Sequence, residues 1–144
     1  MNEVLKEIGE QLRTQDNRCT MDPCFCVQVL ERIGPMDLNY AYKLMFYDHD
    51  EVENYYADGP DPERWLELQE LEHRGNLPEH ITTRGYQEVW KTVQVCFTLA
   101  GAKQHLEING HNYRHYYGTQ IYVDSFYRNP EMQAIREWLM NGEG

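Results

Sequence analysis

The segment from Val93 to Met140 constrains the fold of this chain most, because it carries signals for several elements in a row. Apolar residues at its start alternate with polar ones and predict a half-buried strand (Val93, Val95, Phe97). Thr98 is placed to cap a helix, and Asn109 with Gly110 ends it.

A second strand and a final helix complete this unit. Ile121, Val123 and Ser125 share one face of the predicted strand, which we place in the centre of a sheet together with Tyr122. Asn129 followed by Pro130 provides an N-cap and a proline at the first helical position. Four residues of this helix fall on one of its faces, with Trp138 beside them (Met132, Ile135, Arg136, Leu139).

The same residues carry a resemblance. The runs Asn109-Gly110-His111-Asn112, Ile121 to Ser125, Tyr127 to Glu131 and Ile135 to Met140 resemble the end of a group of small uncharacterised phage and prophage proteins. Thr20 to Pro23, Val27 with Gln28, and the segment around Trp90, Val93 and Phe97 extend it. The resemblance implies a phage-encoded accessory protein and carries no catalytic residues with it.

Length and composition predict one α+β domain over residues 1–144. With 41% hydrophobic residues, the chain can bury a sizeable core. We expect an antiparallel sheet of about four strands with helices packed on one face, and a peripheral helix over residues 1–15 that Gly9 weakens. The chain has neither a long apolar run nor a signal-peptide pattern, which predicts a cytoplasmic protein that does not enter a membrane.

The first half of the chain predicts a β-hairpin and a helix. Pro23 starts an extended run, Gly34 to Asp37 form a turn, and Tyr40 to Tyr47 alternate as a second strand. Asp61 caps a helix that begins at Pro62 and ends near Gly75. Asn76 to Gly85 has no periodicity and predicts an exposed connection.

The charge pattern predicts a basic protein partner. The formal net charge is −11, which opposes non-specific binding to nucleic acid. The stretch from Asp48 to Asp61 carries acids without a Lys or Arg. We therefore expect an acidic surface loop whose binding residues are Asp48, Asp50, Glu51 and Glu53; a solvated charge run is the alternative.

A loop rich in histidine and tyrosine is the second candidate binding site. Tyr and Arg in loops serve as anchors in protein interfaces. The same residues could instead form a structural loop, or His111 or His115 could work with Asp124 in acid and base catalysis. The candidate residues are His111, Asn112, Tyr113, Arg114, His115, Tyr116 and Tyr117.

The metal signals are weak, and no cofactor is expected. Cys24 and Cys26, with Cys19 nearby, lack the spacing of paired zinc ligands, although His111 and His115 could add two nitrogens. The alternative is that Cys24, Cys26 and Cys96 are small buried hydrophobic residues. Asp48 and Asp50 begin like a calcium loop, but Val52 replaces a ligand, so the pattern is not an EF-hand.

Three functional hypotheses follow. The leading one is a non-enzymatic phage accessory protein that binds a host or phage protein, such as a nucleic-acid-handling defence protein inhibited through an acidic surface. The second is a small enzyme or metal protein that uses His111, His115, Asp124 or the cysteines. The third is a virion component.

Overall fold

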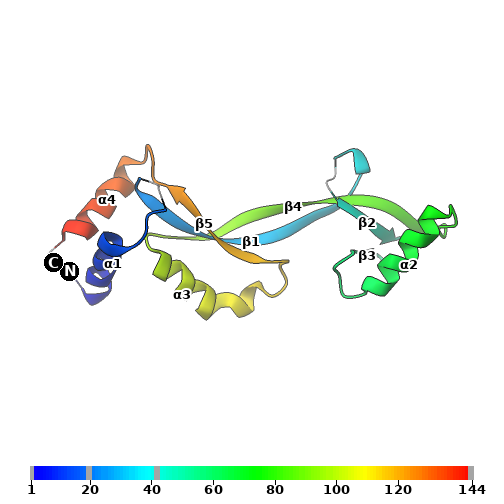
Figure 1. The fold of residues 1–144 in the computed structure, drawn as a ribbon, viewed down its shortest axis with the longest axis horizontal. Helices are drawn as coiled ribbons and strands as arrows, with labels where there is room; N and C mark the ends of the chain where they lie inside the picture. The colour runs from blue at the N-terminus through cyan, green and yellow to red at the C-terminus, as the bar shows by residue number, and fades with distance from the viewer. Residues whose placement is uncertain (1, 19–20, 41–42, 143–144) are drawn as a thin grey trace. The chain divides into compact units, whose positions relative to one another are not determined.

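The computed structural model describes residues 2–18, 21–40 and 43–142 (Figure 1). The strands form a five-stranded sheet with the order β3-β2-β4-β1-β5. The elements are α1 (Glu3–Thr14), β1 (Pro23–Met36), a 3-10 turn (Leu38–Tyr40), β2 (Lys43–Asp48), β3 (Glu53–Tyr55), α2 (Pro62–His73), β4 (Ile81–Cys96), α3 (Leu99–Asn109), a 3-10 turn (Gly110–Tyr113), β5 (Thr119–Ser125) and α4 (Pro130–Asn141).

The predicted α+β class is confirmed, with five antiparallel strands where about four were expected. By its internal contacts the chain divides into two compact units. Unit 1 comprises residues 1–30 and 90–144, and unit 2 comprises residues 31–89. The long strands β1 and β4 each contribute residues to both units. The assignment of residues 1–144 to one domain stays a prediction.

The predicted β1–β2 hairpin is wrong. Gly34 to Met36 lie within β1, and β2 pairs with β4 and β3. Gly34 serves a close approach of two strands, because a Cβ there would lie 2.9 Å from the carbonyl oxygen of Gly85. The Gly-Pro pair therefore reflects strand packing and not a turn. Residues 41–42 of the predicted second strand lie outside the described residues.

The predicted exposed connection from Asn76 to Gly85 is also wrong at its C-terminal end. β4 begins at Ile81, which is 3% exposed and packs with Phe46 and Leu68. The alternation that would signal a strand is absent from Thr82 to Gly85, because these residues pair with β2 and are partly or fully buried without being apolar.

The predicted helix caps are confirmed. The side chain of Thr98 accepts a hydrogen bond from the backbone N–H of Gly101 at 3.0 Å. The side chain of Asp61 accepts from the backbone N–H of Arg64, and that of Asn129 accepts from the backbone N–H of Met132. Each cap satisfies a backbone donor that the first helical turn leaves open, so local sequence fixes where α2, α3 and α4 begin.

The core of unit 1 lies on both faces of β1. Phe25 and Val27 pack with α3, whereas Cys24 and Cys26 form a cluster with Phe126, against which Met132 of α4 packs. Successive side chains of a strand point to opposite faces, so α3 and α4 contact opposite faces. The expectation that helices pack on one face only is therefore wrong.

β5 is an outer strand of the sheet and not the central strand that we predicted for Ile121 and Tyr122. It pairs with β1 along its whole length, from Thr119 opposite Val29 to Ser125 opposite Pro23. Ile121 and Val123 face the α3 side, and Tyr122 lies on the other face and is 51% exposed. Alternation shows which residues share a face but not where the strand lies in the sheet.

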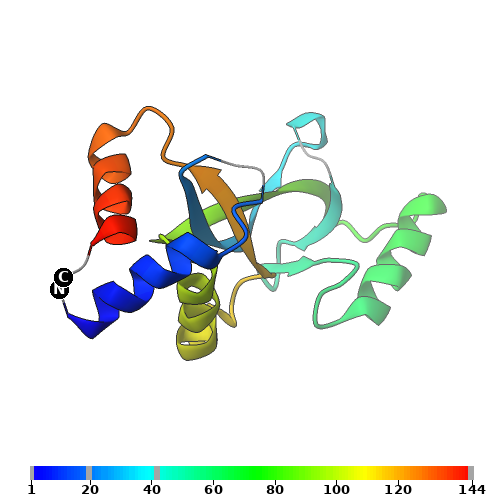
Figure 2. The ribbon, with the colours of Figure 1, turned by 60° about the vertical axis from the view of Figure 1, so that its left-hand side comes forward.

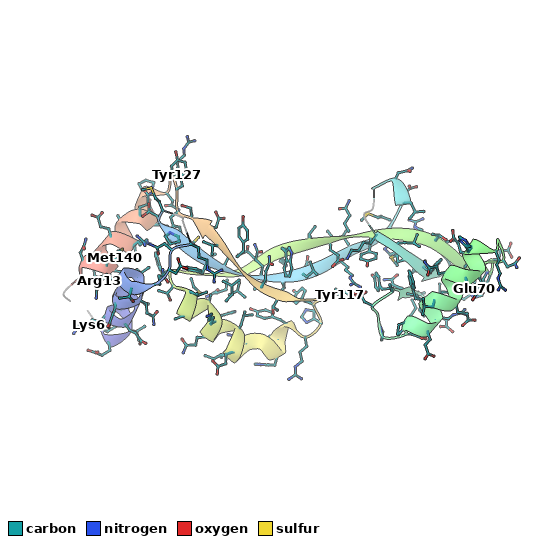
Figure 3. All side chains as sticks on the ribbon, in the orientation of Figure 1. Lys6, Arg13, Glu70, Tyr117, Tyr127 and Met140 are labelled. Atoms are coloured by element: carbon teal, nitrogen blue, oxygen red, sulfur yellow. The ribbon has the colours of Figure 1, made fainter. Side chains whose placement is uncertain are left out.

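The backbones of α1 and α4 approach each other closely at Gly9, and both views show these helices side by side (Figures 1 and 2). A Cβ at Gly9 would lie 2.1 Å from the backbone oxygen of Leu139. Nearby, the guanidinium of Arg13 donates to the carbonyl of Met140 at 2.5 Å (Figure 3). Arg13 thus binds a carbonyl at the negative end of α4. Gly9, which weakens α1 as an isolated helix, is the residue that lets the two helices pack.

We expect Gly9→Ala to lower the free energy of unfolding by about 1 to 3 kcal/mol, the usual penalty for overpacking, despite the better helix propensity of alanine. Gly110→Ala is the matched control, because nothing lies within 4 Å of its added Cβ and its φ is −55°. Chemical denaturation of both variants measures the difference. Equal stability of the two variants would contradict the close contact.

Unit 2 is organised around Arg32 of β1. The side chain of Arg32 is 3% exposed, and its guanidinium carbon lies 4.6 Å from the ring centroid of Tyr56 and 5.0 Å from that of Tyr86. Its Nη2 atom donates to Asp58 at 2.6 Å. Cation–π contacts with a carboxylate partner hold the Tyr56 to Asp58 segment against β4.

Candidate functional site

Unit 1 carries a polar and aromatic surface on the face of the sheet opposite α3. Gln28 and Cys26 share this face of β1, and their register partners on β5 are Gln120 and Tyr122. We name this surface the Trp90–Tyr122 face; its members are Gln28, Leu30, Trp90, Thr92, Gln120 and Tyr122.

Hydrogen bonds connect three strands across this face. The Nε2 atom of Gln120 donates to Oε1 of Gln28 at 2.7 Å, and Nε2 of Gln28 donates to Oγ1 of Thr92 at 3.1 Å. These bonds fix the amide orientations, because each amide uses a defined donor or acceptor. The Oε1 atom of Gln120 accepts no hydrogen bond from another described residue, so it is available to a ligand.

Aromatic rings lie beside this polar row. Trp90 is 43% exposed and Tyr122 is 51% exposed. A Cβ at Gly118 would lie 3.6 Å from the indole of Trp90 and 3.8 Å from Cβ of Leu30, so the indole lies against the start of β5 and the Leu30 side chain. The face therefore offers two large, partly buried rings held on strands.

The Trp90–Tyr122 face carries no formal charge at neutral pH, although 26% of the residues in the chain are charged. Asp124 lies at one end, opposite Cys24. Depletion of charge together with Trp and Tyr is typical of the centre of a protein interface. The sequence prediction did not include this face, since its members come from three separate segments.

The cysteines are unsuited to nucleophilic chemistry. Cys24, Cys26 and Cys96 are free thiols, and burial raises the pKa of all three, that of Cys24 to about 12. The neighbouring Cys26 and Asp124 add to the rise for Cys24. A thiol with a raised pKa carries little thiolate at neutral pH. Cys19 lies outside the described residues.

The loop from His111 to Tyr117 is anchored by its own tyrosines. The hydroxyl of Tyr113 lies 2.7 Å from Nε2 of His105, and the ring centroids of His115 and Tyr116 lie 4.1 Å apart. The backbone N–H of Tyr117 donates to the carbonyl of Leu30 at 3.0 Å, which ties the loop to β1. The side chains that remain exposed are His111, Asn112, Arg114, His115 and Tyr117.

The structure does not bring Asp124 together with the loop histidines. His115 precedes the first residue of β5, whereas Asp124 lies near its last. A strand rises about 3.4 Å per residue, so Asp124 lies roughly 17 Å along β5 from Thr119. The proposed acid and base pair of His111 or His115 with Asp124 is therefore wrong.

The acidic stretch from Asp48 to Asp61 is not a free loop. It contains β3, and several of its carboxylates have structural partners. Asp58 binds Arg32 and Asp61 caps α2, while Glu53 accepts from the hydroxyl of Tyr55 at 3.1 Å. Asp50, Glu51 and Glu53 are exposed at the β2–β3 turn, and we call these three the acidic tip.

Asp48 is buried, which contradicts its assignment as an exposed binding residue. It is 4% exposed, and its Oδ1 atom accepts from the backbone N–H groups of Asp50 at 2.9 Å and Glu51 at 3.1 Å. Its Oδ2 atom lies 4.0 Å from Nε2 of His80. The hydrogen bond from Glu51, with the other contacts, holds the pKa of Asp48 below its usual value.

A groove in unit 1 lies between α1 and α3, with a volume of about 530 Å³. Its walls combine apolar side chains with the polar ends of Glu7, Gln11 and Gln104. Val4 and Val95 at this groove are 64% and 50% exposed. The groove is large enough for a small molecule, but its polar groups do not converge on a hydrogen-bonded arrangement like the one on the Trp90–Tyr122 face.

Comparison with protein-family models, with curated proteins and with solved structures gives no match. Within residues 2–18, 21–40 and 43–142, no group of three or more His, Cys, Asp or Glu side chains is arranged to hold a metal ion. In the same part of the chain, no helix combines the length and the apolar character needed to cross a membrane.

The lowered pKa of Asp48 predicts a defined loss of stability in acid. A carboxyl whose pKa is lower in the folded chain stabilises the fold when the pH is above the pKa of the unfolded chain, which is 3.8. This contribution disappears as the pH falls through the pKa of the folded chain. Asp48→Asn keeps the acceptor oxygen and removes the charge. We expect it to lower the denaturation midpoint at pH 7 and to match the wild type near pH 2. Asp50→Asn is the control at an exposed site, and an equal effect there would contradict this role.

Proposed function

We propose that this protein is a non-enzymatic binding protein that docks a protein partner on the Trp90–Tyr122 face. One observation carries the proposal: two exposed aromatic rings flank a hydrogen-bonded row of uncharged side chains on a sheet. Rings held on strands lose little conformational freedom on binding, and their polar atoms remain able to bond. The resemblance to phage proteins supports a phage-encoded accessory role.

A protein partner fits this face better than a nucleic acid does. Aromatic rings on a sheet can stack on bases, but such sites combine the rings with a positively charged groove. The residues of this face are neutral, and the chain carries a net charge of −11. The face offers phosphates no positive charge to bind, whereas a peptide surface with amide groups can bond to Gln120, Gln28 and Thr92.

Matched aromatic substitutions test the face. We expect Trp90→Ala to weaken binding by about 2 kcal/mol or more, roughly 30-fold in Kd, as for an interface anchor. Trp138→Ala on α4 is the control, because Trp138 is 54% exposed and is not a member of the Trp90–Tyr122 face. A partner is captured with the wild-type chain, and calorimetry measures its affinity for each variant. Wild-type affinity of the Trp90 variant would contradict the proposal.

A second pair extends the test to the other ring. Tyr122→Ala should weaken the complex, whereas Tyr127→Ala should not, since Tyr127 is 71% exposed and projects from the segment before α4 (Figure 3). Both exchanges remove the same side chain. A partner that loses affinity equally with both variants would recognise exposed tyrosines and not this face.

The acidic tip supports a partner that is basic outside the contact area. Exposed charges that a partner does not bury steer encounter and mainly change the association rate. We expect the triple variant Asp50→Asn, Glu51→Gln and Glu53→Gln to associate several-fold more slowly, with a smaller dependence on salt over the range where the Debye length is about 8 to 10 Å. Surface plasmon resonance on the captured partner measures both. An unchanged association rate would leave the tip as a solubilising surface.

A further inference from the structure

The outer edge of β5 is a second feature of unit 1 that a partner could use. At the ends of the antiparallel β1–β5 pairing, the backbone N–H of Leu30 donates to the carbonyl of Gly118, and the backbone N–H of Phe126 donates to the carbonyl of Asp22. These two bonds lie just beyond the two ends of the paired segment of β1 and β5. Since hydrogen-bonded positions alternate, the even-numbered residues of β5 direct their backbone groups to β1 and the odd-numbered ones direct theirs outward.

Ile121 and Val123 direct their backbone groups to the side of β5 on which the described sheet has no further strand. Ser125 differs, because its N–H donates to the side chain of Asp124 at 2.8 Å. An outer strand with open N–H and C=O groups is a template for another strand. Proteins commonly protect such edges with lysine, proline or a bulge, and Thr119 to Ser125 contains no lysine or proline.

The sequence of β5 is complementary to itself when reversed. We propose that two copies of this chain pair through β5, antiparallel, about a two-fold axis at Tyr122. This register places Thr119 opposite Ser125, Gln120 opposite Asp124 and Ile121 opposite Val123 of the second copy. Ile121 and Val123 are then the hydrogen-bonded positions, as their outward backbone groups require.

Each cross-strand pair in this register is chemically favourable. The Gln120 amide can donate to the Asp124 carboxylate, the β-branched residues meet each other, and the Tyr122 rings meet at the axis. Tyr122 occupies a non-hydrogen-bonded position, where the Cα atoms of facing residues are about 4.5 Å apart. Sliding the strands so that Asp124 faces its own mate would set like charges opposite each other, which disfavours that register.

This pairing shares Gln120 and Tyr122 with the Trp90–Tyr122 face, but Trp90 separates it from the proposed partner site. It uses the edge of β5, whereas Trp90 lies on β4 and takes no part in it. Trp90→Ala should therefore leave the oligomeric state unchanged while it weakens partner binding. If the chain is a dimer but Trp90→Ala does not weaken partner binding, the pairing stands and the proposed function falls. If the chain is a monomer and Trp90→Ala does weaken partner binding, the proposed function stands and the pairing falls.

Cross-linking tests the axis directly. Disulfides need Cα atoms about 4.4 to 6.8 Å apart, which the two Tyr122 positions satisfy. With oxidised glutathione as the oxidant, the thiols that Tyr122→Cys introduces into the two copies should join as one disulfide, while glutathione disulfide is reduced to two thiols. The controls are the wild-type chain, for its native cysteines, and Tyr127→Cys at an exposed site outside β5. Neither should form the covalent dimer, and cross-linking of all three chains to the same extent would overturn the proposal.

Mixed cross-linking tests the register. Gln120→Cys and Asp124→Cys should each cross-link poorly alone and efficiently when the two chains are mixed, because only then do the new thiols face each other. Cross-linking of Gln120→Cys with itself, at the efficiency of the mixture, would overturn the two-fold at Tyr122.

Charge exchange tests the pairing without oxidation. Gln120→Glu sets two carboxylates against Asp124 in each dimer and should raise the dimer dissociation constant about tenfold. The double variant Gln120→Glu with Asp124→Lys restores two opposite-charge pairs and should return the constant toward the wild-type value. Sedimentation analysis over a concentration series measures all three chains, with circular dichroism to confirm folding. A wild-type chain that stays monomeric at every concentration, or a double variant no tighter than the single one, would overturn the proposal.

Discussion

The fold depends on the double burial of the first half of β1. From Pro23 to Val27 every residue is buried, and Val29 is fully buried as well. A strand covered on both faces needs apolar contacts on each side, which α3 supplies to Phe25 and Val27 and the Phe126 cluster supplies to Cys24 and Cys26. Burial of each large side chain contributes about 1.5 to 3 kcal/mol. Because β1 lies between β4 and β5, these contacts also fix the strands that carry the Trp90–Tyr122 face.

Features set by neighbouring residues were predictable from the sequence. The caps at Asp61, Thr98 and Asn129 satisfy donors only three residues away, so their chemistry is complete within one helical turn. Features set by distant residues were not. The local sequence predicts a turn at Gly34, but the structure places Gly85 beside it. The local sequence also predicts a weak point of the helix at Gly9, but the structure places Leu139 against it. In both cases a glycine admits a close approach of two backbones, which local sequence does not reveal.

The candidate site was less predictable than the fold for the same reason. Gln28, Thr92 and Gln120 are ordinary polar residues in three separate segments, and only the strand order places them in one hydrogen-bonded row. The acidic stretch misled because charge alone does not tell a solvated carboxylate from a structural one. Asp48 holds a turn, Asp58 binds a buried arginine and Asp61 caps a helix, so these acids act within the fold.

The placement of charge explains how a chain with a net charge of −11 can still make specific contacts. Screening limits the reach of exposed charges to about 8 Å at physiological ionic strength, so repulsion at a contact depends on the charges that lie near it. The Trp90–Tyr122 face is neutral, and at the β5 edge Asp124 meets Gln120 in the register that we propose. The excess acid then opposes non-specific association over most of the surface. Contact at the neutral face, or at an edge where Asp124 meets an uncharged Gln120, meets little opposition at short range.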